Sequence, residues 1–89
     1  MASRLQNFLD ENGRVTQWPS KRAVQLEVVE YIASHFPDGS QYNEGQLNEN
    51  IKDLHTFGDW AIIRREMCDL GYFTRDKNGV IYTRVEKVL

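Results

Sequence analysis

The sequence predicts a mainly α-helical domain with a small β-hairpin wing, the architecture of a winged helix-turn-helix. Two observations carry this prediction. Residues 43–55 and 57–70 each show the apolar spacing of an amphipathic helix, and only a tight turn separates them. Residues 72–75 and 80–85 then alternate apolar and polar side chains around 76–79, whose Asn-Gly dipeptide is a strong hairpin signal.

The whole chain, residues 1–89, is expected to form one domain of this kind. Its first part, 1–19, is predicted to hold a short helix over 3–11 followed by an extended connector. The helix is expected to stop at Asn12-Gly13, because glycine accepts the left-handed conformation that ends many helices. Residues 20–85 are then the winged-helix core.

Residues 20–36 give the strongest helix signal of the chain. Ser20 is suited to cap its first turn, and Pro37 cannot continue it. A wide stripe of this helix is apolar, which is typical of a central core helix. The stripe consists of Val24, Val28, Val29, Ile32, Ala33 and Phe36.

A two-residue strand is predicted at 41–42, directly before the helix-turn-helix. Asn43 and Gln46 have the spacing of a capping box, so the first helix of the pair should begin there and run to about His55. Thr56 is then expected to cap the second helix, 57–70, and Gly71 to close it. Its core-facing side chains are predicted to be Trp60, Ile63, Met67 and Leu70.

Composition limits what the protein can do. Eighty-nine residues suffice for one domain. No apolar run approaches the roughly 20 residues that span a bilayer, and the N-terminus has no signal-peptide core, so a cytoplasmic protein without membrane contact is expected. The net charge of −2 argues against a strong electrostatic attraction to nucleic acid.

Neither a metal site nor an active site is indicated. The soft ligands His35, His55 and Cys68 lack the paired spacing of a zinc site, so we expect two polar histidines near helix ends and a partly exposed thiol. The chain has no nucleophile elbow and no glycine loop for phosphate. We therefore expect no cofactor and no enzymatic activity.

The outward face of helix 57–70 is the candidate functional surface. At about 100° per residue, Arg65 points directly away from the predicted core and Ile62 shares its side. Arg64 lies on the flank, where it has a binding role or pairs with Asp53 or Asp69. From the wing, the cations expected to point outward are Arg75, Lys77 and Arg84.

Several segments resemble a bacterial family of domains of unknown function, the one numbered 2087. They are GRVTQWPSKR, YNEGQLNENI, GDWAIIRREMCDLGYFTR and IYTR, with Ile63 where the family has the leucine of Leu-Arg-Arg. The resemblance implies a place in transcriptional control, because such domains are often appended to winged-helix regulators. The matching positions include Tyr42, Glu44, Asn48, Asp59, Arg64 and Arg65.

Two functions remain open from the sequence. The first is a DNA-binding module of a transcription regulator, with helix 57–70 in the major groove and the hairpin on the backbone of double-stranded DNA. Its contacts are predicted to be Arg64, Arg65, Arg75, Lys77 and Arg84. The alternative is a protein-interaction or dimerisation module that presents Ile62 and Arg65 to a partner protein or to a second copy.

Overall fold

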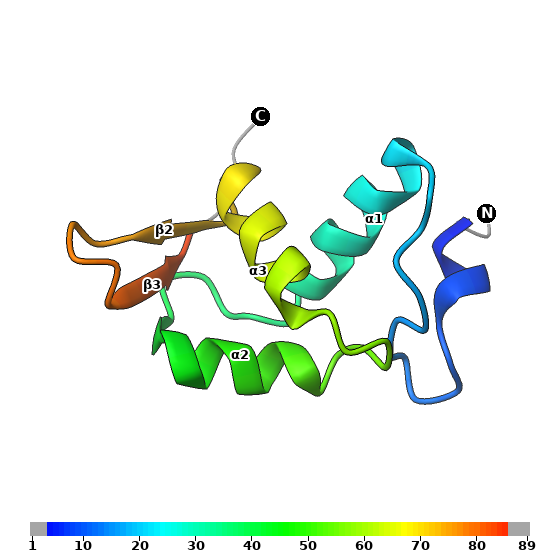
Figure 1. Ribbon diagram of the computed structural model, residues 1–89, viewed down its shortest axis with the longest axis horizontal. Coiled ribbons are helices and arrows are strands. Elements are labelled where there is room, and N and C mark those ends of the chain that lie inside the picture. The colour runs from blue at the N-terminus through cyan, green and yellow to red at the C-terminus, as the bar shows by residue number, and fades with distance from the viewer. Residues whose placement is uncertain (1–3, 86–89) are drawn as a thin grey trace.

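Three α-helices and a three-stranded antiparallel sheet make up residues 4–85, the part of the chain that the computed structural model describes (Figure 1). This arrangement is compatible with a winged-helix-like α/β fold. The β2–β3 hairpin and the N-terminal 3-10 helix, η1, lie at opposite ends of the molecule in Figure 1. In order, the elements are η1 Arg4–Phe8, α1 Arg22–Ala33, β1 Gln41–Asn43, α2 Glu44–Lys52, α3 Trp60–Asp69, β2 Phe73–Arg75 and β3 Ile81–Arg84.

The sheet has the strand order β1-β3-β2, so the last strand is its centre. Tyr42 of β1 lies opposite Tyr82 of β3, and Arg75 of β2 lies opposite the same Tyr82 on the other side. The expected strand at 41–42 is confirmed and extends by one residue to Asn43. Because β1 follows α1 and precedes α2, its pairing with β3 attaches the hairpin to the helices.

The core lies between α1, the α2–α3 pair and one face of the sheet. The predicted apolar stripe is confirmed as core, since its members from Val24 to Phe36 are all buried, but α1 ends at Ala33 and not at Phe36 as predicted. Ile63 and Met67 of α3 are fully buried against it, and Phe36 makes edge-to-face contacts with Tyr42 and Phe73 at 5.4 and 5.3 Å between ring centroids. Burial of side chains of this size contributes about 1.5–3 kcal/mol each.

The predicted capping box of α2 is confirmed. Asn43 Oδ1 accepts the Gln46 N–H at 2.8 Å, and Gln46 Oε1 accepts the Asn43 N–H at 3.0 Å. Two donors at the helix N-terminus that lack intrahelical partners are thereby satisfied. This cap fixes where α2 leaves β1, and hence where its first residue, Glu44, lies.

The predicted start of α3 at residues 56–57 is wrong. The helix begins at Trp60, and its cap is Asp59, whose carboxylate accepts the Ile62 N–H at 3.2 Å. The chain does not turn into a helix at Thr56, because the Thr56 N–H donates to the Val15 carbonyl at 2.8 Å and His55 forms a β-bridge with Val15. Gly58, in the loop between α2 and α3, has φ +78°, a left-handed conformation that glycine adopts readily.

The N-terminal prediction also needs correction. The helix expected over 3–11 is a 3-10 helix that ends at Phe8, and residue 3 lies outside the described residues. The Asp10 carboxylate accepts the N–H groups of Asn12 and Arg14 at 2.9 and 2.8 Å, which forms a turn instead of a further helical turn. Helix α1 likewise begins after Lys21, with no side-chain cap from Ser20.

The hairpin turn is not the two-residue turn that an Asn-Gly dipeptide favours. Gly79 has φ +68°, but no non-glycine residue within 4–85 has a positive φ, so Asn78 is not left-handed. Gly79 N–H donates to the Asp76 carbonyl at 3.0 Å, and Val80 N–H donates to the Asp76 carboxylate at 2.8 Å. A tight turn followed by one left-handed glycine is typical of longer hairpin loops. A two-residue turn of the Asn-Gly type needs two residues with positive φ.

A candidate ligand-binding cleft between helix α3 and the hairpin

A cleft of about 310 Å³ lies between α3 and the β2–β3 hairpin. We call it the arginine cleft. Five of its lining residues come from one face of α3, because their spacing of three and four residues matches the helical repeat. The hairpin supplies the other two, which are cross-strand neighbours. The lining consists of Ala61, Arg64, Arg65, Cys68, Asp69, Arg75 and Tyr82.

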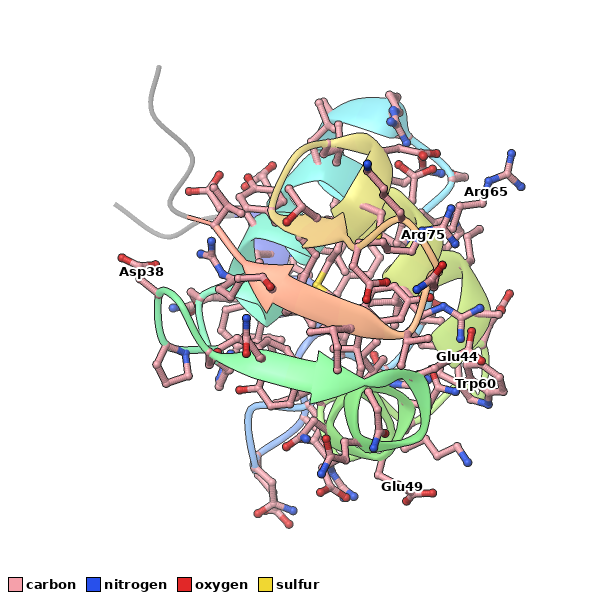
Figure 2. All side chains as sticks on the ribbon, turned by 90° about the vertical axis from the view of Figure 1, so that its left-hand side faces the viewer. Asp38, Glu44, Glu49, Trp60, Arg65 and Arg75 are labelled. Atoms are coloured by element: carbon pink, nitrogen blue, oxygen red, sulfur yellow. The ribbon has the colours of Figure 1, made fainter. Side chains whose placement is uncertain are left out.

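Arg65 is more exposed than the other lining residues that form ion pairs, Arg64 and Asp69. Its side chain is 80% exposed, and its nearest carboxylate is Asp69, one helical turn away, at 3.8 Å from Nε. An exposed pair of this kind contributes little to stability. Figure 2 shows Arg65 extending away from the ribbon on the side of the molecule that also carries Arg75. The guanidinium is therefore available to a ligand.

Arg75 ends β2 and lines the cleft from the hairpin side, whereas Arg65 lines it from α3. A hydrogen bond to Tyr82 is the main cause that raises the pKa of this exposed guanidinium above its ordinary value. The Tyr82 hydroxyl in turn lies 3.4 Å from Glu44 Oε1. Tyr82 therefore lies beside both the Arg75 guanidinium and the Glu44 carboxylate. Lys77, at the hairpin tip, is exposed.

Arg64 connects α3 to α2 instead of extending into solvent. Its Nη1 donates to Asn48 Oδ1 at 2.8 Å and lies 3.4 Å from Glu44 Oε1. The guanidinium also stacks over the Trp60 ring at 5.3 Å from the centroid. The expected pairing with Asp53 or Asp69 is wrong, because the beginning of α2 supplies the partners.

Arg84 points inward, contrary to the expectation that it extends outward from the wing. Its Nε donates to the Ala33 carbonyl at 3.0 Å, its Nη1 donates to the Val85 carbonyl, and Asp38 lies 3.9 Å away. The side chain is only 10% exposed. The Ala33 carbonyl, the last of α1, also accepts the Phe36 N–H at 3.0 Å, so Arg84 adds a charged donor to an acceptor at the C-terminal end of the helix. Arg84 thus fastens β3 to α1.

Ile62 is half-buried and packs against the core, although it was expected on the outward face. Glu66, one turn further along α3, explains the difference: its carboxylate lies 2.9 Å from the Arg22 guanidinium of α1. This side of α3 therefore faces α1, and most of the apolar surface of Ile62 is covered.

Cys68 lies in the wall of the arginine cleft and is partly exposed, as expected. Burial is the main cause that raises the pKa of its thiol, and the nearby charges of Arg75 and Arg64 oppose this shift. Desolvation outweighs the two cations, so the inner wall of the cleft is partly shielded from water. The thiol is protonated at neutral pH.

His55, expected as a polar histidine near a helix end, lies just after α2 and is buried at 4% exposure. Its Nδ1 lies 2.7 Å from the Ile51 carbonyl, its ring packs edge-to-face on Phe57, and Nε2 has no hydrogen-bond partner within residues 4–85. The cause is a parallel bridge between Val15 and His55, which draws the end of α2 under the N-terminal connector. Because Val15 and His55 are far apart in the sequence, no local sequence pattern indicates this contact.

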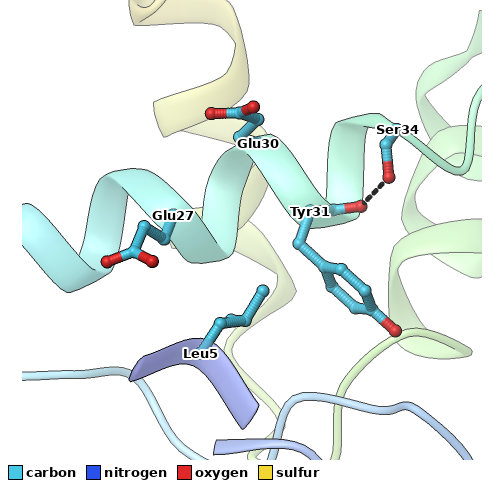
Figure 3. A pocket seen from close by; sticks show the side chains of 5 residues that line it. All are labelled: Leu5, Glu27, Glu30, Tyr31 and Ser34. Atoms are coloured by element: carbon cyan, nitrogen blue, oxygen red, sulfur yellow. Dashed lines mark hydrogen bonds between the residues drawn. The ribbon is translucent and has the colours of Figure 1, made fainter. Parts of the chain in front are cut away.

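A second hollow, of about 320 Å³, lies between η1 and α1. We call it the acidic hollow, because two of its five lining residues are glutamates and none is basic. Figure 3 shows Leu5 of η1 below α1 and the Tyr31 ring beside it. Tyr31 Oη donates to the Gly13 carbonyl at 2.6 Å, and this bond holds the connector against α1. The lining is Leu5, Glu27, Glu30, Tyr31 and Ser34.

Two further features concern other classes of function. Across residues 4–85, no group of three or more His, Cys, Asp or Glu side chains is arranged to hold a metal ion. Nor does this part of the chain contain a helix with the length and apolarity needed to cross a membrane.

The fold and the cleft define a small helical domain with a three-stranded sheet and an arginine-lined cleft between its last helix and its hairpin. The chain belongs to the family described as uncharacterized protein conserved in bacteria (DUF2087), which it matches over residues 14–84. That match confirms the resemblance seen in the sequence and covers the whole arginine cleft. No curated protein and no solved structure matches the chain.

Proposed function

We propose that this domain is a winged-helix module of bacterial transcriptional control that binds duplex DNA, with α3 in the major groove and the hairpin over the backbone. One observation carries the proposal: Arg65 of α3 and Arg75 of β2 are exposed on the same side of the molecule. The element order and the strand order β1-β3-β2 support it, because in a winged helix the helix before the hairpin is the one that enters the groove.

The structure supports different roles for the cations. Arg65 is the guanine reader, since its guanidinium is exposed on the outer face of α3 and suits a bidentate bond to guanine. Arg75 and Lys77 are the phosphate contacts from the hairpin. Arg64 and Arg84 leave the set, because their hydrogen bonds within the protein occupy them.

The electrostatics predict weak, salt-sensitive binding. Three cations neutralise about three phosphates, so log K should fall with log salt at a slope of roughly −2.7, about a 40-fold loss between 50 and 200 mM salt. Asp69 beside Arg65 and Asp76 beside Lys77 further limit the attraction. Because the net charge is −2, overall electrostatic attraction to DNA is weak. Affinity must then come from the orientation of the basic face towards DNA and from additional contacts.

The test is a fluorescence-anisotropy titration of random-sequence duplex DNA at about 50 mM salt, repeated at higher salt. Arg65→Gln should weaken binding and relax sequence preference, and Lys77→Gln should flatten the salt slope by about 1. Lys21→Gln is the matched control: it removes one charge from an exposed residue just before α1, outside the proposed face, and should change neither property.

Absence of binding at protein concentrations above about 10⁻⁴ M would overturn the proposal, since non-specific binders already associate there. That result would favour the accessory function, in which the domain binds a protein partner or a second copy. Ile62 supports that function less than the sequence suggested, because it is half-buried. Arg65 serves either function.

A further inference from the structure

We propose that the arginine cleft also binds the phosphate group of a small phosphorylated molecule, a ligand distinct from DNA, through the same Arg65 and Arg75 side chains that the proposed DNA contact uses. The cleft volume of about 310 Å³ is close to the lower end of the range for small-molecule sites, about 300–1,000 Å³. Ala61, the smallest side chain of the lining, leaves the space between α3 and the hairpin unfilled. The occupant is therefore a phosphate with a small body.

The charges of the lining select an anion. Three of the seven lining residues are arginines and one is an aspartate, in a chain whose net charge is −2. Glu44 lies at the rim and pairs with Arg64, and Asp69 pairs with Arg65, so the surplus is one positive charge, that of Arg75. The Arg65–Asp69 pair is exposed and long, at 3.8 Å, so an incoming anion displaces it at low cost.

The arrangement of the arginines favours phosphate over carboxylate. Arg65 approaches from α3 and Arg75 from β2, so they face the cleft from two separate elements. A carboxylate has two oxygens and is satisfied by a single guanidinium, whereas a phosphate monoester offers three oxygens to donors from different directions.

The inner wall adds to the attraction. Burial is the main cause that raises the pKa of the Cys68 thiol, so this part of the cleft is partly shielded from water. Charge-assisted hydrogen bonds are stronger in such surroundings than on an open surface. The acidic hollow has nearly the same volume but two glutamates and no arginine, so size alone does not make a phosphate site in this molecule.

Cys68 provides the readout, because it is the sole cysteine of the chain and lies in the cleft wall. The experiment measures the rate of its alkylation by iodoacetamide, a neutral reagent, at constant pH in the full-length protein. Inorganic phosphate, phenyl phosphate and benzoate are compared with sodium chloride at equal ionic strength. We expect saturable slowing by both phosphates, stronger for phenyl phosphate, and little effect of benzoate.

Two variants and one control localise the effect. Arg65→Gln and Arg75→Gln should each raise the phosphate concentration for half-maximal protection about tenfold, as expected for one lost charge-assisted hydrogen bond. Lys77→Gln removes the same charge from the hairpin tip, outside the cleft lining, and should leave protection unchanged. All three side chains are exposed, so the fold tolerates their replacement.

Equal alkylation rates in phosphate and chloride would overturn the proposal, as would protection that persists in both arginine variants. Protection by benzoate equal to that by phenyl phosphate would reject the selectivity for phosphate. No DNA is present in these measurements, so their failure is distinguishable from a failure of the proposed DNA binding.

Discussion

The arginine cleft and the acidic hollow have nearly the same volume, about 310 and 320 Å³, but opposite linings. The first lies between α3 and the hairpin, and the second lies between η1 and α1, towards the other end of the molecule (Figure 1). The net charge of −2 is a total over the whole chain and conceals regions of opposite sign such as these two. The distribution of charge over the surface, and not its total, therefore indicates where an anion binds.

The two regions also differ because some arginines near α3 and the hairpin form hydrogen bonds within the protein and others stay exposed. Arg84 and Arg64 are held by backbone and side-chain acceptors of α1 and α2, so they stabilise the structure. Arg65 has an exposed ion pair with Asp69, and Arg75 is an exposed residue opposite Tyr82 in the sheet. Counting basic residues near α3 and the hairpin therefore overestimates the binding surface.

The largest expected effect concerns α3, which forms one wall of the cleft. Ile63→Ala should lower the free energy of unfolding by about 2–5 kcal/mol, because Ile63 is fully buried between α3 and the core. Ala61→Ser, on the cleft side of the same helix, should cost less than about 0.5 kcal/mol. Chemical denaturation checks both; similar losses would show that the assigned orientation of α3 is wrong.

The next effect separates the internal arginines from the exposed ones. Arg84→Met should cost about 1.5–3 kcal/mol, since it removes a charged donor from the Ala33 carbonyl. Arg65→Gln should stay within about 0.5 kcal/mol of the wild type. Thermal and urea unfolding measure the two values. A neutral Arg84→Met would mean that Arg84 does not fasten β3 to α1.

A smaller effect belongs to the acidic hollow. Tyr31→Phe removes the hydroxyl that donates to the Gly13 carbonyl and should lower stability by about 0.5–1.5 kcal/mol. Binding of phosphate or DNA at the other end should not change. Urea unfolding gives the first quantity. A loss of phosphate protection at Cys68 in this variant would contradict the separation of the two regions.

The smallest effect is a pH dependence of the hairpin turn. The Val80 N–H bond to Asp76 is the main cause that lowers the pKa of this carboxyl below its ordinary 3.8. The stabilisation is therefore present above pH 3.8 and is lost as the pH falls through the folded-state pKa. The Val80 amide chemical shift should titrate with a midpoint below 3.8. Asp76→Asn should abolish that titration, and a midpoint above this value would contradict the assignment.

Local patterns predicted the helices, the capping box and the hairpin, because each depends on residues within one or two turns of one another. The start of α3 was wrong because Thr56 is bound to Val15, which is remote in the sequence. Arg84 was misassigned for the same reason: its acceptor, Ala33, is 51 residues away. The helical spacing of α3 correctly predicted that Arg65 is exposed. The partners of Arg64 come from α2, so they could be identified only from the folded structure.

The most direct test of the account is an NMR titration of the isotope-labelled protein with random-sequence duplex DNA at about 50 mM salt. The account predicts that amide shifts gather on α3 and the β2–β3 hairpin, with Arg65 and Arg75 among the most affected, while Glu27, Tyr31 and Ser34 of the acidic hollow stay unchanged. Shifts centred on the acidic hollow, or none at saturating DNA, would contradict it.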